Sequence, residues 1–572
     1  MRILWVMLLT GLVALAGCHR PSAPASSATP EVAPPPMQGM VHPLKTTADW
    51  ARGAQLFEGL GSRHRVVTTS SPEAQRYFDQ GVALMWGFNH DEATRSFAKA
   101  TELDPDCAAC YWGVSLTVGP NYNLPFLSAE RAAVAFEALR KAQEQAARAS
   151  PVEQALISAL VRRYPNAQPL DPASALPVLT EYAMAMKDVA QRFPDDLDVQ
   201  TLYAESMMNL RAWKLWTPAG AAAPGTEQVL ATLEAVLKRD ASHPGANHYY
   251  VHAMEASAHP EKAVASAERL RDLLPGAGHL VHMPAHIFQR VGRYEEAADA
   301  NRRAAKADER YGALTTPPDY YPVMYTAHNY QFLAYSVAME GRRAETIDAV
   351  NRSRAAVSDS MLLEMPGADW YVAEYYTARV RFGLWYELLA TPAPDSRIPG
   401  LLGGYLYGRA MAQAATGHLA DSRLSLASLN ALITRLPADT PAGQNQLKDV
   451  LNIASAMIEA RIASAELRPR EELEWLRKAV VAEDRIAYDE PKNWFVSTRH
   501  ALGAALLRSG AAQEAEAVYR DDLIQSPANG WALYGLRAAL AAQGKAAEAK
   551  VVAAEFKKAW SRADVSLGSS VF

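Results

Sequence analysis

The sequence predicts an all-α protein built from repeated pairs of antiparallel helices. Two observations support this fold class. Beyond residue 45 the chain is rich in Ala, Leu, Glu and Arg, and it almost nowhere alternates apolar and polar residues as a half-buried strand would. Small residues also recur at fixed steps inside pairs of helical segments, which is typical of repeat architectures.

The repeat is defined by anchors at constant spacing. Gly81 is followed after 12, 16, 19 and 24 residues by Ala93, Phe97, Ala100 and Pro105. The same steps occur in two further segments, which contain Gly503, Ala515, Tyr519 and Pro527, and Val251, Ala263, Ala267, Leu270 and Pro275. We expect the glycines to let two helices approach closely, the aromatic residues to fill the core between repeats, and the prolines to end the second helix.

These anchors resemble the tetratricopeptide repeat (TPR). The order of the segments resembles a family of bacterial TPR lipoproteins, through phrases such as HYYVHAMEAS, GHLVHMPAHIFQRVGRYEEA, YDEPKNWF and NGWALYGLRAAL. The resemblance covers about residues 46–572 and implies a TPR-like helical-hairpin solenoid (superhelix) with irregular inserted helices. The clear repeats are expected at about 74–107, 244–276, 278–310 and 496–528, and the others are degenerate. The family resemblance brings no established reaction.

The N-terminus reads as a targeting segment. Arg2 precedes the apolar run 3–16, and the sequence LAGC ends at Cys18. This pattern resembles the lipobox of bacterial lipoproteins, which implies a signal peptide over 1–17 and a lipid on Cys18; an ordinary signal peptide with an incidental cysteine is the alternative. A Pro/Ala/Ser-rich linker follows over 18–45. We expect a bacterial envelope protein facing the periplasm, and His19 after the cysteine favours the outer membrane.

Composition limits the partners. The net charge is -5 and the pI is near 6.3, so neither nucleic acid nor an anionic membrane surface is expected as a partner. No apolar run after residue 20 is long enough to span a bilayer. The only expected contact with a membrane is therefore the lipid anchor.

Two further cysteines stand three residues apart, at Cys107 and Cys110. An even number of cysteines in an oxidising compartment, at a spacing that a helix brings within disulfide range, favours a local disulfide. A soft-metal pair is the alternative. A c-type haem site is excluded, because Tyr111 stands where that motif requires histidine.

Histidines give the strongest indication of chemistry. Seven of the fourteen lie between His243 and His286. Several are three or four residues apart, so that on a helix they share one face. Aligned with the repeat, they fall at positions that face the concave groove, where neighbouring first helices lie about 8–10 Å apart. The predicted metal ligands are His248, His252, His282 and His286, with His279 and His328 extending or orienting the set.

Imidazole ligands suit zinc, iron or copper, and copper is the least favoured of the three here. Glu205 and Glu255 are candidates for a carboxylate ligand or a catalytic acid/base. His243, His259 and His418 are expected in turns between helices, and His90 in packing. His500 beside Arg499 is expected to form a salt bridge or to bind an anionic group.

Three functions remain open from the sequence. The leading hypothesis is an envelope-anchored scaffold whose concave groove binds a ligand, with a histidine-rich transition-metal site. The first alternative is an interaction module without metal, in which a protein or peptide occupies the groove. The second is a metal-dependent hydrolase or oxidoreductase acting on a small ligand at the metal.

Overall fold

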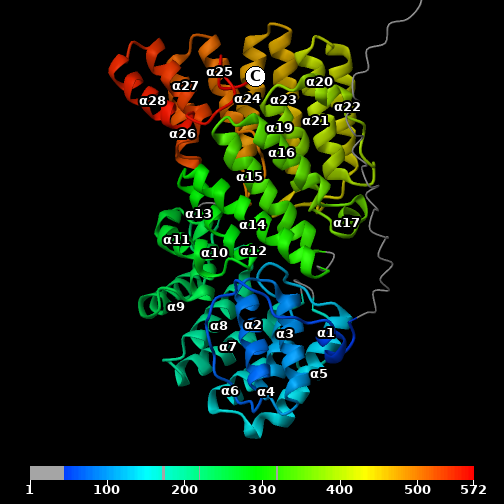
Figure 1. Ribbon diagram of the computed structural model, residues 1–572. Helices are drawn as coiled ribbons and strands as arrows, with labels where there is room; N and C mark the ends of the chain where they lie inside the picture. Colours follow the sequence, from blue (N-terminus) through cyan, green and yellow to red (C-terminus); the bar gives the residue numbers. More distant parts are fainter. Residues whose placement is uncertain (1–43, 171–173, 218–219, 317–319) are drawn as a thin grey trace, which may run out of the picture. The chain divides into compact units, whose positions relative to one another are not determined.

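A computed structural model describes residues 44–170, 174–217, 220–316 and 320–572. Within these ranges the protein is almost entirely helical, and the prediction of an all-α helical-hairpin solenoid is confirmed (Figure 1). The predicted signal peptide, Cys18 and most of the linker lie outside the described residues.

The helices of the first half are α1 (Thr47–Ala51), α2 (Pro72–Trp86), α3 (His90–Leu103), α4 (Ala108–Thr117), α5 (Ala129–Gln145), α6 (Pro151–Leu160), α7 (Leu176–Arg192), α8 (Leu197–Met208), α9 (Thr226–Arg239), α10 (Pro244–Glu255), α11 (Val264–Leu273), α12 (Gly278–His282), α13 (Pro284–Arg290) and α14 (Tyr294–Leu314). Those of the second half are α15 (Ala327–Met339), α16 (Arg343–Ala355), α17 (Asp359–Glu364), α18 (Asp369–Val372), α19 (Glu374–Arg381), α20 (Trp385–Ala390), α21 (Pro399–Ala415), α22 (Leu419–Arg435), α23 (Leu447–Ala465), α24 (Pro469–Glu483), α25 (Thr498–Arg508), α26 (Ala512–Gln525), α27 (Gly530–Ala542) and α28 (Ala546–Ala559). Short elements are the 3-10 turns η1 (Ala146–Arg148), η2 (Asn209–Arg211) and η3 (Pro260–Ala263), the π-helical turn η4 (Pro322–Thr326), and the antiparallel strands β1 (Pro441–Ala442) and β2 (Asn445–Gln446).

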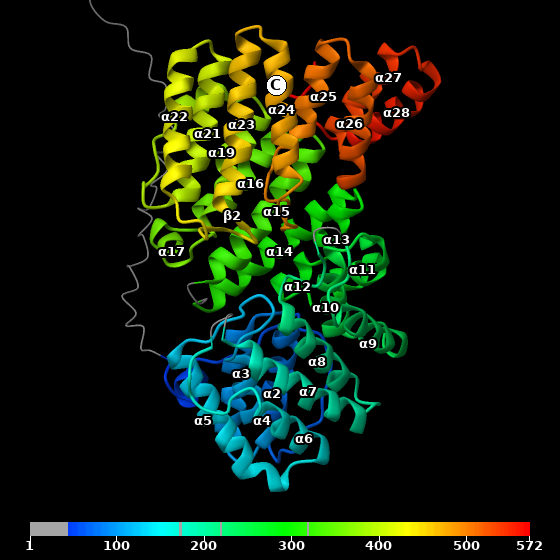
Figure 2. The ribbon, with the colours of Figure 1, turned by 180° about the vertical axis from the view of Figure 1, so that it is seen from behind.

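Consecutive helices pack as hairpins, and the hairpins stack. Such pairs include α2/α3, α15/α16, α21/α22, α23/α24, α25/α26 and α27/α28. The first helices of neighbouring hairpins also contact each other, as α21 contacts α23 and α25 contacts α27. Viewed from behind, α21 to α24 lie side by side (Figure 2). This stacking gives the first helices a common inner surface.

The predicted anchors lie at the closest helix contacts. A Cβ on Gly81 would lie 2.6 Å from the ring of Phe97, and one on Gly113 of α4 would lie 2.5 Å from the same ring. Tyr519 is held in the same way, because a Cβ on Gly503 would lie 2.4 Å from its ring. In these two places one aromatic side chain of a second helix therefore fills the space between two first helices whose glycines leave room for it.

One predicted helix is interrupted. The spacing of the histidines after residue 278 predicts a single helix, but the structure has α12 and α13, which are separated at Met283. Pro284 follows directly, and a proline has no N–H to continue the hydrogen-bond ladder. The amide of His286 bonds instead to the carbonyl of Met283 at 3.2 Å, three residues back.

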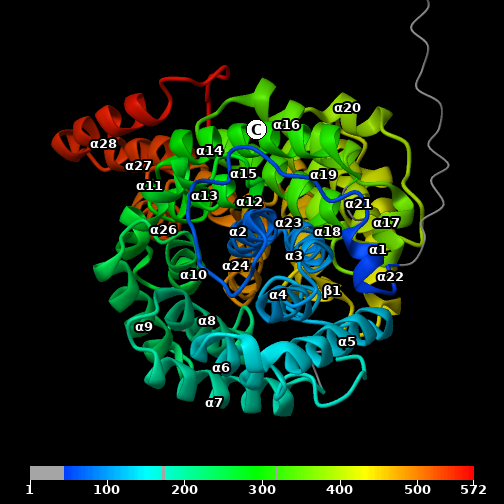
Figure 3. The ribbon, with the colours of Figure 1, turned by 60° about the horizontal axis from the view of Figure 1, so that its bottom comes forward.

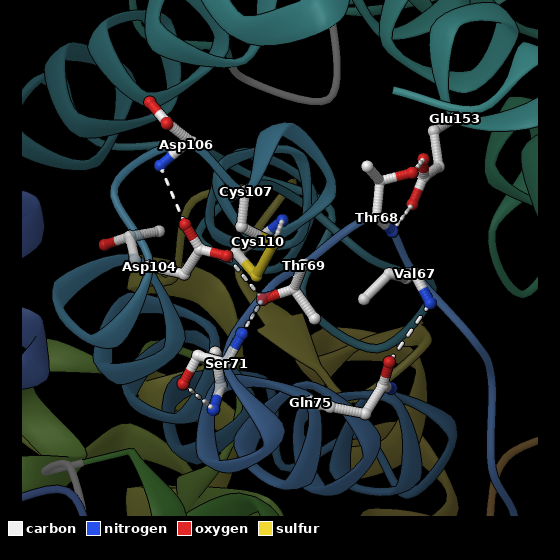
Figure 4. Close-up of a disulfide and its surroundings, with 12 residues drawn as sticks. Val67, Thr68, Thr69, Ser71, Gln75, Asp104, Asp106, Cys107, Cys110 and Glu153 are labelled. Carbon is white, nitrogen blue, oxygen red and sulfur yellow. Dashed lines mark hydrogen bonds between the residues drawn. A yellow bond between two sulfur atoms is a disulfide. The ribbon is translucent and has the colours of Figure 1, made fainter. Parts of the chain in front are cut away.

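Cys107 and Cys110 form a disulfide at the start of α4, with a Cα–Cα distance of 5.3 Å (Figure 4). The turn before it is held by Asp104, whose carboxylate accepts hydrogen bonds from the Thr69 hydroxyl at 2.5 Å and from the Ser70 amide at 3.0 Å. The disulfide therefore lies at the junction between the segment that precedes α2 and the start of α4.

Segments distant in sequence meet around the middle of the chain. The carbonyl of Trp86 at the end of α2 lies 2.6 Å from a ring nitrogen of His248, and α2 contacts α10 (Figure 3). The Tyr325 hydroxyl donates to the carbonyl of Phe88 at 3.0 Å. Within the described ranges, no helix has both the length and the apolar character needed to cross a membrane.

The glycine contacts give a test of the fold. Gly113→Ala should lower the free energy of unfolding by about 1–3 kcal/mol, because the added methyl group overlaps the buried ring of Phe97. The control is Gly312→Ala in α14, where a Cβ meets nothing within 4 Å and alanine should stabilise the helix by about 0.5–1 kcal/mol. Urea unfolding followed by circular dichroism measures both, and equal effects would contradict the proposed role of Gly113.

A candidate metal centre

Six histidines from four helices converge in the interior. Helix α10 provides His248 and His252, and α12 provides His279 and His282. His286 comes from α13 and His328 from α15. Five of the six are at most 5% exposed, and His328 is half-buried.

The rings form two sets of three. In the first set the centroid of His248 lies 4.9 Å from those of His252 and His279. In the second set the centroid of His282 lies 4.6 Å from that of His286 and 4.9 Å from that of His328. Within each set, one ligand atom per residue can be chosen so that all three lie within 4.8 Å of one another.

The two sets adjoin each other. The centroids of His252 and His286 are 5.7 Å apart, and those of His279 and His282 are 5.9 Å apart. Aromatic rings enclose both sets. Phe88 lies 4.4 Å from His248 and stacks on His279 at 5.5 Å, and Phe332 lies 4.7 Å from His282.

Hydrogen bonds orient four of the imidazoles in the same sense. The Nδ1 atom of His248 lies 2.6 Å from the carbonyl oxygen of Trp86, and that of His282 lies 2.6 Å from the amide oxygen of Asn301. The remaining Nδ1 atoms face carboxylates: that of His252 lies 2.8 Å from Glu255, and that of His286 contacts Glu255 and Glu490. Because these oxygens accept hydrogen bonds, each Nδ1 carries the proton, and a neutral ring presents the lone pair of Nε2 to the interior.

Among the six histidines, two buried ring nitrogens have no hydrogen-bond partner in the described part of the chain, namely Nε2 of His252 and Nδ1 of His279. Nε2 of His279 lies 3.1 Å from Nε2 of His248 and donates to its lone pair. An unpaired polar atom in a closed interior is costly, since it has lost water without replacement. The first set therefore holds two unsatisfied lone pairs.

The second set is linked to a pair of glutamates. Burial alone lowers the pKa of His286, but the carboxylates of Glu490 and Glu255 outweigh it and raise this pKa to about 10. Burial and the negative charge of Glu255 raise the pKa of Glu490 well above its usual value. The pKa of Glu255 is well below its usual value, because the favourable charge of His286 and hydrogen bonds exceed the cost of burial. At neutral pH His286 is thus an imidazolium, which donates from Nε2 to His282 across 2.6 Å.

The other histidines of the two sets are neutral. Burial, followed by neighbouring imidazoles, lowers the pKa values of His248, His279 and His282 well below the usual range. Burial also lowers the pKa of His328 to about 3. Neutral imidazole is the form that binds a metal ion.

Two sequence expectations need correction. The histidines were expected on an open groove, but they are enclosed, because the turn between α2 and α3 places Phe88 over them. Glu205 was expected near the site, but its carboxylate bonds to Asn209 at 2.5 Å and not to any of the six histidines. Glu255 does lie in the site, where it holds His252 and His286 in place.

The other histidines in the described part of the chain contact nearby residues, as exposed His64 contacts Asp79 at 2.7 Å. His243 caps α10 and bonds to Asp198 at 2.9 Å, whereas exposed His259 lies beside Glu261 and exposed His418 beside Thr416. His90 is buried beside Phe88, with ring centroids 5.8 Å apart. His500 is bonded to Asp522 at 2.8 Å and to Arg381 at 2.9 Å.

Several residues of the site were not identified from the sequence. Glu490 and Tyr488 come from the segment between α24 and α25, and the Tyr488 hydroxyl lies 3.2 Å from Glu255, more than two hundred residues away in the chain. Asn301 belongs to a second helix, α14, and Phe88 to a turn. One signal for Tyr488 and Glu490 was present in the sequence: both lie in the phrase YDEPKNWF, which contributes to the family resemblance. The resemblance did not indicate which residues they contact.

Comparison with known proteins gives limited similarity. No family model and no curated protein matches the chain. Among solved structures, the human IFIT1 dimer with m7Gppp-AAAA is 8% identical, covers 86% of this chain and 96% of its own, and has a TM-score of 0.31. Yeast Tom70 is 12% identical, and the match covers 86% of this chain and 93% of Tom70, with a TM-score of 0.29. The TPR domain of P58(IPK) is 12% identical, and the match covers 82% of this chain and 98% of that domain, with a TM-score of 0.21.

We take no function from these similarities. The chain's own stacked hairpins and its glycine–aromatic contacts define the class to which it belongs: a TPR-like helical solenoid with a buried histidine–glutamate cluster.

The role of Glu255 can be tested on metal-free protein. Glu255→Gln removes the charge that faces the buried imidazolium of His286 and should destabilise the fold by about 3–5 kcal/mol. The matched control is Glu261→Gln, because Glu261 pairs with His259 on the surface, where both side chains are more than half exposed at 59% and 66%. Urea unfolding midpoints should shift strongly for the first variant and stay unchanged for the second. Equal midpoints for Glu255→Gln and the parent would contradict this role.

Proposed function

We propose that the protein is an envelope-anchored TPR-like scaffold whose buried histidine cluster binds two transition-metal ions. One ion would be held by His248, His252 and His279, and the other by His282, His286 and His328. Zinc, iron and copper are the metals that such imidazole sets accept. We place a protein or peptide partner on the inner surface formed by the first helices of the hairpins.

The observation that carries this proposal is the shared orientation of four imidazoles. Each has Nδ1 held by a carbonyl, amide or carboxylate oxygen and Nε2 turned inward. Histidines that bind metals commonly have this second contact, which selects the tautomer and increases the basicity of the ligating nitrogen. A cluster that served packing alone would need no common tautomer.

The proton distribution supports the same conclusion. In the first set the lone pair on Nε2 of His252 has no partner, and a cation held among the three rings would accept it. In the second set the proton on Nε2 of His286 occupies the place where a cation would bind, 2.6 Å from His282. Binding there would release that proton, as is general for metal sites built from histidine.

Burial favours a structural ion over a catalytic one. Structural sites are closed, whereas catalytic sites keep one position open to substrate. Five of the histidines are at most 5% exposed. Glu255, the candidate acid/base, is already bonded to two imidazoles and to Tyr488. The ions would therefore connect α10, α12, α13 and α15 and stabilise the curvature of the solenoid.

Metal content tests the proposal directly. Tag-free full-length protein, purified without chelator, should contain about two ions per chain by elemental mass spectrometry. Removal of the metal should lower the melting temperature, since a ligand at one hundred times its Kd adds about 2.7 kcal/mol. A parent protein that neither retains metal nor binds added zinc, iron or copper would exclude the proposal without the need for any variant.

Matched variants locate the sites. The double variant His252→Ala, His286→Ala removes one ligand from each set and should lose tight binding of both ions. The control, His64→Ala with His418→Ala, changes two exposed histidines that lie outside the sets and should keep the full metal content. Circular dichroism shows whether each variant is folded. Equal metal content in both double variants would contradict the assignment.

The envelope location is tested separately. In a bacterial host fed with a radioactive fatty acid, the parent should carry the label and fractionate with membranes. Cys18→Ser should lose both properties, because the lipid is expected on that thiol. Cys107→Ser is the control and should keep the label, because Cys107 belongs to the disulfide. Labelled Cys18→Ser protein would contradict the lipidation.

A further inference from the structure

A second site lies on the inner surface of the C-terminal hairpins. The structure contains a cavity of about 310 Å³ there, lined by residues of α19, α20, α21, α23, α24 and α25 and by Val571 and Phe572. Its volume falls in the range of roughly 300–1,000 Å³ that is typical of sites for small molecules. None of the histidines of the metal centre lines it.

Most of the cavity wall is apolar and shaped for a hydrophobic body. The apolar side chains include Trp385, Met411, Met457, Leu476 and Val496. Methionines adapt to ligands of irregular shape, and the indole ring of Trp385 offers a broad flat surface. The wall is therefore suited to an alkyl or aryl group.

The polar part of the wall has an excess of positive charge. Three arginines line the cavity, Arg381, Arg461 and Arg508, against the single carboxylate of Glu472. That carboxylate pairs with Arg508. Arg461 forms no ion pair with any described residue; its guanidinium lies over Trp385, 5.6 Å from the ring centroid. Of these three arginines, only Arg508 forms an ion pair with a described residue.

Arg381 is held at the inner end of this group. Its Nη1 donates to Nδ1 of His500 at 2.9 Å, and Nε2 of His500 bonds to Asp522 at 2.8 Å. One face of the guanidinium is covered by Trp531, with Cζ 3.8 Å from the ring centroid. The atoms Nε and Nη2 are buried and have no partner among the described residues. These two nitrogens form one edge of the guanidinium, but neither is exposed, so Arg381 contributes positive charge behind the cavity wall and not a direct contact.

Burial makes both unpaired cations costly. Burial is the main reason that the pKa of Arg381 falls to about 9, and it also lowers the pKa of Arg461. An anion in the cavity would offset this cost, because opposite charges attract strongly where water is excluded. An uncharged ligand of the same shape would leave it in place.

We propose that this cavity binds an amphipathic monocarboxylate, with its carboxylate on Arg461 and its apolar body against Trp385, Met411 and Met457. The assignment is independent of the metal centre, which lies on other helices. It commits to a planar anion joined to an alkyl or aryl group, because an inorganic anion would make no use of the apolar wall.

The test is a titration of the full-length protein with dodecanoate, 1-dodecanol and inorganic phosphate, below the micelle concentration. Dodecanoate should bind at one site per chain, and dodecanol at least tenfold more weakly, because it lacks the charge. Phosphate should not bind. Dodecanol that binds as tightly as dodecanoate, or dodecanoate that does not bind at all, would overturn the proposal.

Variants connect the binding to the arginines. Arg461→Met keeps most of the side-chain volume and should weaken dodecanoate at least tenfold while leaving dodecanol unchanged. Arg461→Lys keeps the charge and should weaken dodecanoate less, which separates loss of charge from loss of folding. The control is Arg470→Met, at an exposed arginine of α24 that lies outside the cavity. Unchanged affinity in folded Arg461→Met protein would overturn the assignment.

Discussion

The contact between a backbone glycine and a buried aromatic ring sets the spacing of this solenoid. Phe97 fits against Gly81 and Gly113, and Tyr519 fits against Gly503 in the same way. Any larger residue at these glycines would push the helices apart. First helices of neighbouring hairpins contact each other, so their side chains come within reach of one another, as the imidazoles of α10, α12, α13 and α15 do in the metal centre.

The two sites show two uses of one inner surface. In the N-terminal half, the turn after α2 places Phe88 over the histidines and removes them from solvent. In the C-terminal half, the same kind of surface remains open enough to form a cavity of about 310 Å³. Enclosure favours ions held for structure, whereas a partly open wall with unpaired guanidinium groups favours an exchangeable ligand.

Electrostatic balance explains why the histidine cluster is compatible with burial. Six imidazoles together could not all be charged in the interior, and burial leaves every one of them except His286 with a lowered pKa. The one strongly favoured imidazolium, His286, lies against Glu255 and Glu490. The two carboxylates in turn differ, since the pKa of Glu255 lies well below its usual range and that of Glu490 well above it. The cluster thus keeps its buried charges paired.

The sequence by itself determined the all-α class, the repeat anchors and the six histidines, because periodic spacing along a helix specifies which side chains share a face. Only the tertiary structure decided that these histidines are enclosed, that Glu205 bonds to Asn209 and not to them, and that Glu490 joins them from beyond α24. The same holds for the unpaired edge of Arg381. The reason is physical: burial, pairing and pKa depend on what lies opposite a side chain, and in a solenoid of irregular repeats that neighbour comes from a distant turn whose position no local pattern encodes.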